Sequence, residues 1–100
     1  MANRRRREDW QRRAQQVRDI CADRTLALWQ KAHLVGAACK DVQLDGLQSK
    51  HRHKIFAGLA KINIILARYP IETFDDYALI DSEDLHTIIN TFKAYGAMNI

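Results

Sequence analysis

The chain has 100 residues, of which 47% are hydrophobic and 28% are charged, and its formal net charge is +4. This length suits one domain with a modest core, and no apolar run approaches the ~18–20 residues that a membrane-spanning helix needs. Four Gly and one Pro leave little material for the turns of a β-rich protein, so the composition favours an all-α fold.

The charges are distributed unevenly along the chain. Residues 1–69 carry fifteen Lys and Arg against six Asp and Glu, whereas residues 70–100 carry one Lys against six Asp and Glu. An asymmetry of this size predicts either a surface for a charged partner or the docking of one part of the molecule on another.

The N-terminal part has the pattern of a long helix. Apolar residues recur at helical spacing from Trp10 to Val42, which predicts one long or kinked helix over about 8–40. A straight helix of that length would measure about 50 Å, roughly twice the diameter of a compact domain of this size. We therefore expect either a break near residues 23–25 or a basic half that projects and pairs with something else, such as a second copy in a homodimer. Residues 1–8 can form a disordered basic arm.

A turn and a second long helix are predicted next. Asp45 and Gly46 favour a turn over 41–46, and apolar residues share one face of the segment 47–68. Pro70 ends this helix at or before the preceding residue.

Shorter helices are predicted in the acidic C-terminal part. Thr73 and Asp76 form a partial capping pattern for a short helix. A final helix over 83–95 places five apolar residues on one face, namely Leu85, Ile88, Ile89, Phe92 and Tyr95. The chain is thus predicted to be one all-α domain over 1–100, a small helical bundle with one long or kinked N-terminal helix, a second long helix and one or two shorter C-terminal helices.

Basic residues gather near the start of the second long helix. On a helix, Lys50, Lys54, Lys61 and Arg68 project within about 40° of one another, and Arg52 belongs to the same basic run. The positive end of the helix adds to their attraction for phosphate or carboxylate groups. Lys50, Arg52, Lys54 and Lys61 are therefore candidate nucleic-acid-binding or partner-binding residues; the alternative is a solvated basic face.

A second basic cluster lies in the N-terminal part and supplies the candidates Arg5, Arg6, Arg12 and Arg13. Consecutive arginines point in all directions around a helix, so they suit a mobile arm that neutralises phosphates without reading base sequence. The alternative is a charged terminus that only keeps the chain soluble.

Four further residues are candidates for a protein interface: Trp10, Ile64, Asp75 and Asp76. Trp10 lies among arginines, a combination that is typical of interface hot spots, and Ile64 falls on the basic side of the second long helix. The alternatives are that Trp10 packs on Val17 or the core and that the two aspartates only cap a helix.

No residue pattern predicts catalysis, a metal site or a cofactor. His51 and His53 face nearly opposite ways on a helix, and the other two histidines are not followed by a ligand-type residue at i+3 or i+4. No known catalytic motif is present. Cys21 and Cys39 form no disulfide framework, and no secretory signal is recognised. This combination favours a reducing, cytoplasmic setting.

The sequence therefore predicts a non-enzymatic binding protein whose basic helical surface docks onto nucleic acid or a nucleoprotein complex. The alternative is a small protein-binding inhibitor or adaptor, of the kind encoded by phages and plasmids, that blocks a site on a larger nucleic-acid-handling machine. Neither hypothesis needs a cofactor, a metal or a membrane.

Overall fold

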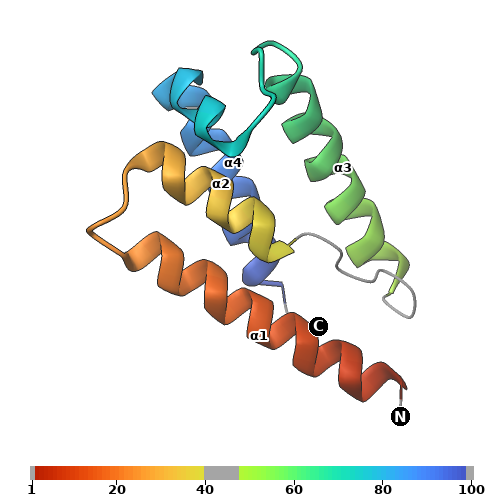
Figure 1. Cartoon of the computed structure of the whole chain (residues 1–100). Helices are drawn as coiled ribbons and strands as arrows, with labels where there is room; N and C mark the ends of the chain where they lie inside the picture. Colours follow the sequence, from red (N-terminus) through yellow and green to blue (C-terminus); the bar gives the residue numbers. More distant parts are fainter. Residues whose placement is uncertain (1, 40–47, 99–100) are drawn as a thin grey trace.

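The computed structural model describes the backbone of residues 2–39 and 48–98, and the side chains from Arg7 onward within those ranges. In chain order its regular elements there are α1 (Ala2–Ala22), α2 (Leu28–Cys39), α3 (Ser49–Leu66), the 3₁₀ helix η1 (Phe74–Leu79) and α4 (Ser82–Gly96). These helices form the predicted small all-α bundle, which is thereby confirmed (Figure 1). The turn predicted over 41–46 lies outside the described residues. Within the described ranges, no helix combines the length and the hydropathy that a membrane span requires.

Of the two expectations for the N-terminal segment, the break is the one observed. Residues 23–27 separate α1 from α2, which folds back antiparallel along it (Figure 1). The Asp23 carboxylate accepts hydrogen bonds from the Thr25 backbone N–H at 2.8 Å and from its hydroxyl at 2.6 Å, an arrangement that competes with helix continuation. Gln30 then accepts from the Ala27 N–H at 2.8 Å, which starts α2. Residues 2–8, for which the sequence allowed a disordered arm, lie in the first turns of α1.

Helix α4 lies at the centre of the bundle and packs against α1, α2 and α3. Its buried side chains are those of the predicted apolar face: Leu85, Ile88, Ile89, Phe92 and Tyr95. Their spacing of three or four residues makes one continuous stripe, and α1 and α2 cover much of it. The core therefore lies mainly between α1, α2 and α4, and α3 packs on one side of it.

The predicted capping pattern at η1 is present. The Asp76 carboxylate accepts from the backbone N–H groups of Glu72 and Thr73 at 2.8 and 2.9 Å, and the Thr73 side chain completes the capping box. These hydrogen bonds place η1 against α2. In the packing, His33 of α2 stacks on Phe74, with 4.7 Å between ring centroids.

Helix α3 packs against α4 alone among the described elements, and Figure 1 shows it standing to one side of the α1–α2 hairpin. Ile55, Ile62 and Ile65 are its buried residues. The Tyr95 hydroxyl of α4 donates a hydrogen bond to the Ile55 carbonyl oxygen at 2.8 Å. That close approach requires Gly58, because a Cβ built there would lie 1.7 Å from the Tyr95 hydroxyl oxygen. Most of the remaining surface of α3 is consequently left exposed.

Candidate binding surface on helix α3

Three of the predicted basic residues lie together on α3. Lys50, Lys54 and Lys61 are exposed, and the helical rotation of about 100° per residue places them, with exposed Arg68 just beyond the helix, within about 40° of one another. We call these four residues the basic row. Arg52 is exposed as well, but it lies about 160° around the helix from Lys50. The structure therefore separates Arg52 from the group to which the sequence assigned it.

Among the described residues, no carboxylate pairs with the lysines of the basic row. Helix α3 contains no Asp or Glu, and within the described residues Lys50, Lys54 and Lys61 make no ion pair. Arg68 has a distant partner, since its Nη1 lies 3.8 Å from Asp84 Oδ1 while its side chain stays 60% exposed. The positive charge of the row is thus available to a partner.

Positive charge at this end of α3 opposes helix stability. The first two turns carry Lys50, Arg52 and Lys54 with no acidic residue, and Gln48 at the N-cap provides no side-chain hydrogen bond. Each cation near a helix N-terminus is unfavourable by ~0.3–1 kcal/mol at low salt. These residues therefore do not contribute to the stability of α3 through the helix dipole.

An exposed apolar stripe lies beside the basic row, and the sequence pattern indicated only one of its residues, Ile64. Phe56 and Ile64 expose 57% and 60% of their surface, and Ala57, Ala60 and Ala67 are exposed between and beyond them. We call these five residues the apolar stripe. Phe56 was missed because it lies about 100° from the buried Ile55 face, where a single aromatic residue gives no periodic signal.

The N-terminal arginines do not act as the expected mobile arm where their side chains are described. Arg13 donates to Asp9 at 2.8 Å and to the Ala38 carbonyl oxygen at 3.0 Å, and Arg12 also pairs with Asp9. Burial acts to raise the pKa of Asp9, but the hydrogen bonds and charges of the two arginines outweigh it and lower that pKa. Arg12 and Arg13 are therefore tied to Asp9 on α1, and Arg13 also to α2. Arg5 and Arg6 lie in α1, and their side chains are outside the described residues.

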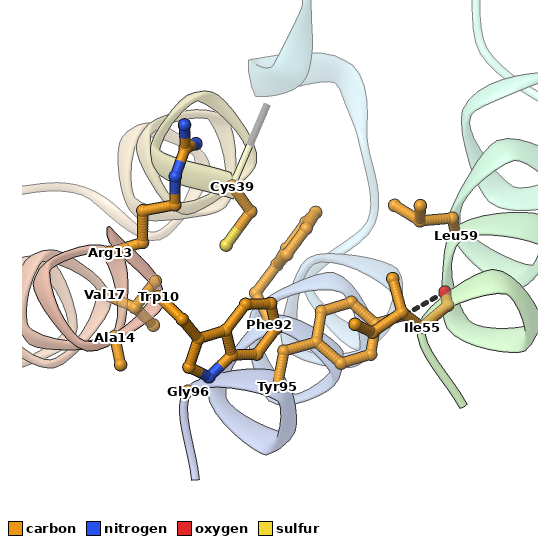
Figure 2. A pocket seen from close by; sticks show the side chains of 10 residues that line it. All are labelled: Trp10, Arg13, Ala14, Val17, Cys39, Ile55, Leu59, Phe92, Tyr95 and Gly96. Atoms are coloured by element: carbon orange, nitrogen blue, oxygen red, sulfur yellow. Dashed lines mark hydrogen bonds between the residues drawn. The ribbon is translucent and has the colours of Figure 1, made fainter. Parts of the chain in front are cut away.

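Trp10 is a core residue rather than an exposed anchor, in agreement with the alternative that it packs inside. It is 7% exposed and lines a cavity of about 20 Å³ between α1, α3 and α4, where its indole N–H has no hydrogen-bond partner (Figure 2). Burial raises the pKa of the Cys39 thiol in this cavity to about 11, against the opposing charge of Arg13. Burial also raises the pKa of Tyr95 to about 12. Both groups stay protonated near neutral pH, so neither supplies a nucleophile or a base there.

The two acidic interface candidates have different surroundings. The Asp76 carboxylate is occupied by the capping box, and the backbone N–H groups of Thr73 and Glu72 lower its pKa. Asp75 is exposed on η1 beside Phe74, which is 55% exposed. Asp76 therefore has a structural role as a cap of η1, and the assignment of Asp75 and Asp76 to an interface stays a prediction.

The described residues contain no group of three or more His, Cys, Asp or Glu side chains that could hold a metal ion. Among the described residues, α3 combines lysines that make no ion pair there with exposed apolar side chains. The 3₁₀ helix η1 likewise combines exposed Asp75 with exposed Phe74 and Leu79. Comparisons of the chain with protein-family models, with curated proteins and with solved structures found no match.

Proposed function

We propose that this protein is a non-catalytic adaptor or inhibitor that binds a partner protein through the outer surface of α3. The observation that carries the proposal is the apolar stripe directly beside the basic row, whose lysines make no ion pair within the described residues. Free thiols at Cys21 and Cys39 fit a reducing, cytoplasmic setting for this interaction.

The apolar stripe favours a protein partner over nucleic acid. Phosphate recognition uses cationic and polar side chains, and Lys54 and Lys61 could serve it. Ile64 and the alanines beside them make no favourable contact with phosphates. Burying them against an apolar protein surface would instead stabilise the complex by ~25 cal/mol per Å² buried. Exposed Phe56 adds an aromatic side chain, a residue type that is enriched at interface centres.

The basic row and the apolar stripe would have different tasks in such a complex. Charges at the edge of an interface mainly accelerate association and orient the partner. Buried aromatic and aliphatic side chains supply most of the affinity. The partner is therefore expected to present an acidic surface around an apolar patch.

The test is affinity capture of partners from a lysate of the organism that encodes the chain, with and without nuclease. The test variant carries Phe56→Gln and Ile64→Gln, which keep good helix formers on α3. The matched control carries Phe74→Gln and Leu79→Gln, because these residues are equally exposed, at 55% and 56%, on η1. We expect the test variant to lose the captured protein by about tenfold or more and the control to keep it.

Two results would contradict this function. Equal capture by the test variant and the wild type would remove α3 from the interaction. Loss of the complex after nuclease, together with direct binding to DNA or RNA that weakens steeply as salt rises, would instead establish the nucleic-acid hypothesis for the same lysines.

A further inference from the structure

The exposed residues of α3 follow a seven-residue repeat. Lys54, Lys61 and Arg68 of the basic row are each seven residues apart. In the apolar stripe, the exposed residues Ala57, Ala60, Ile64 and Ala67 alternate at spacings of three and four. Apolar positions with this alternation are the a and d positions of a heptad, at which one helix packs along another.

In this register, the apolar stripe, Lys54, Lys61 and Arg68 take defined places, and Lys50 falls at an a position, so the apolar seam begins only at Ala57. Ala57 and Ile64 occupy a positions, Ala60 and Ala67 occupy d positions, and the three basic residues all occupy e positions. Phe56 lies at the g position on the opposite edge of the seam. Residues at e and g face the charged residues of a packed partner helix and determine which helix is accepted.

We propose that the outer surface of α3 receives one amphipathic helix of a partner protein, and that this helix carries an acidic residue once per heptad beside its apolar seam. The proposal rests on the proposed function and specifies its partner. Lys54 and Lys61 lie one heptad apart on α3 and require carboxylates at the same spacing for charge complementarity. Arg68, just beyond the end of α3, already has the Asp84 carboxylate 3.8 Å away. Alanine at three of the four seam positions leaves room for larger apolar side chains on the incoming helix.

A second copy of this chain does not meet these requirements. A symmetric α3–α3 contact would bring two carboxylate-free helices together, each with a basic row, and like charges at such an interface repel. No described helix of the chain carries two carboxylates seven residues apart, so none offers the matching acidic row. The occupant is therefore a helix from a different protein.

The seam is short, which sets the expected strength of binding. The four seam positions run from Ala57 to Ala67, a length of about 15 Å, and alanine buries less surface than leucine would. We therefore expect weak, salt-sensitive binding in which the charged pairs decide between partner helices.

The test uses two synthetic helical peptides of identical composition, each about three heptads long. Both carry leucine at a and d; the first has Glu at e and g beside the seam, and the second has those Glu at b and c on the far side. Binding of each labelled peptide to the full-length protein is measured by fluorescence anisotropy at low and physiological salt. We expect the first peptide to bind about tenfold more tightly at low salt and this preference to shrink as salt rises.

Charge reversal on the protein provides the decisive comparison. The variant with Lys54→Glu and Lys61→Glu should lose the preference for the first peptide and bind a version with Lys at e and g instead. The control with Arg24→Glu, in the turn between α1 and α2, and Lys93→Glu, on α4, makes the same change in net charge away from α3 and should behave as the wild type does. Thermal unfolding by circular dichroism verifies that each variant is folded.

Equal binding of the two peptides, or an unchanged preference after reversal of Lys54 and Lys61, would overturn the heptad proposal. The proposed function would then still stand if the variant at Phe56 and Ile64 loses its captured partner. A dimer in solution that becomes monomeric in that same variant would also overturn the proposal, because a second copy would then cover the apolar stripe. If the captured partner does not depend on α3 at all, both proposals fail together.

Discussion

At the scale of single residues, one glycine and one phenol attach the candidate binding surface to the rest of the protein. The Tyr95 hydroxyl reaches the backbone of α3 only because position 58 has no side chain, and a Cβ there would also lie 2.8 Å from the Thr91 methyl group. Glycine within a helix is normally unfavourable by ~1 kcal/mol relative to alanine. Here its absence of a side chain permits a buried hydrogen bond and a close helix contact.

We predict that Gly58→Ala destabilises the protein although alanine favours helices. Overpacking of this kind costs ~1–3 kcal/mol, which outweighs the gain in helix propensity. The measurement is the free energy of unfolding from urea titrations. Gly36→Ala is the matched control, because a Cβ there would meet Phe92 at an ordinary 3.8 Å and should leave stability unchanged or higher. Equal stabilities for the two variants would show that Tyr95 does not pack on α3 as described.

At the scale of the helices, the sequence predicted those elements whose apolar residues lie on one face. All five residues predicted to form the apolar face of α4 are buried. Their spacing of three or four residues places them on one face of a helix, so the sequence alone identifies them. The N-terminal segment was left open because its apolar register continues across the break. The turn there depends on hydrogen bonds that the Asp23 carboxylate accepts from Thr25, and the spacing of apolar residues does not indicate such bonds.

The sequence likewise predicted only part of the candidate surface. Helical rotation alone places Lys50, Lys54 and Lys61 on one flank. The exposure of Phe56 depends on α3 packing against α4 only, which is a property of tertiary structure. The ion pairs of Arg12 and Arg13 likewise need the folded hairpin, because one of the acceptors is the Ala38 carbonyl oxygen of α2.

Among the helices, we predict that the amides of α3 exchange with solvent sooner than those of α4. Helix α3 is held by a single neighbour and buries three residues, whereas α4 has contacts with three helices. Segments with few buried contacts open at lower free energy. Hydrogen exchange followed by mass spectrometry measures this order directly. Equal protection of α3 and α4 would mean that they unfold as one unit, contrary to this expectation.

At the scale of the whole molecule, several hydrogen-bonded carboxylates link stability to acid pH. The pKa values of Asp9, Asp23 and Asp76 are all lowered in the folded protein. At Asp9, burial acts to raise the pKa, but the two arginines outweigh it. The largest causes of the lowered pKa are a hydrogen bond from Thr25 at Asp23 and one from Thr73 at Asp76. A carboxyl group with a lowered folded-state pKa releases its proton more readily in the folded state. Its contribution to stability is therefore complete above the unfolded-state pKa and is lost as pH falls through the folded-state value.

We accordingly predict a constant free energy of unfolding from about pH 7 to pH 5 and a decline below about pH 4, near the ordinary pKa of aspartate. Urea titrations at a series of pH values measure it. Asp76→Asn removes one of the three groups and should make the acid decline shallower. Stability that increases on acidification would show that these carboxylates are not held by the contacts described.

The close contact of α3 with α4 at Gly58 has a consequence for how this protein could diversify. A change at position 91 or 95, both on α4, would alter the contact that sets the distance and angle between the two helices. Every exposed residue of α3 would stay the same, while the angle at which the proposed binding surface is presented would differ. Selectivity could thus evolve from the interior of the bundle.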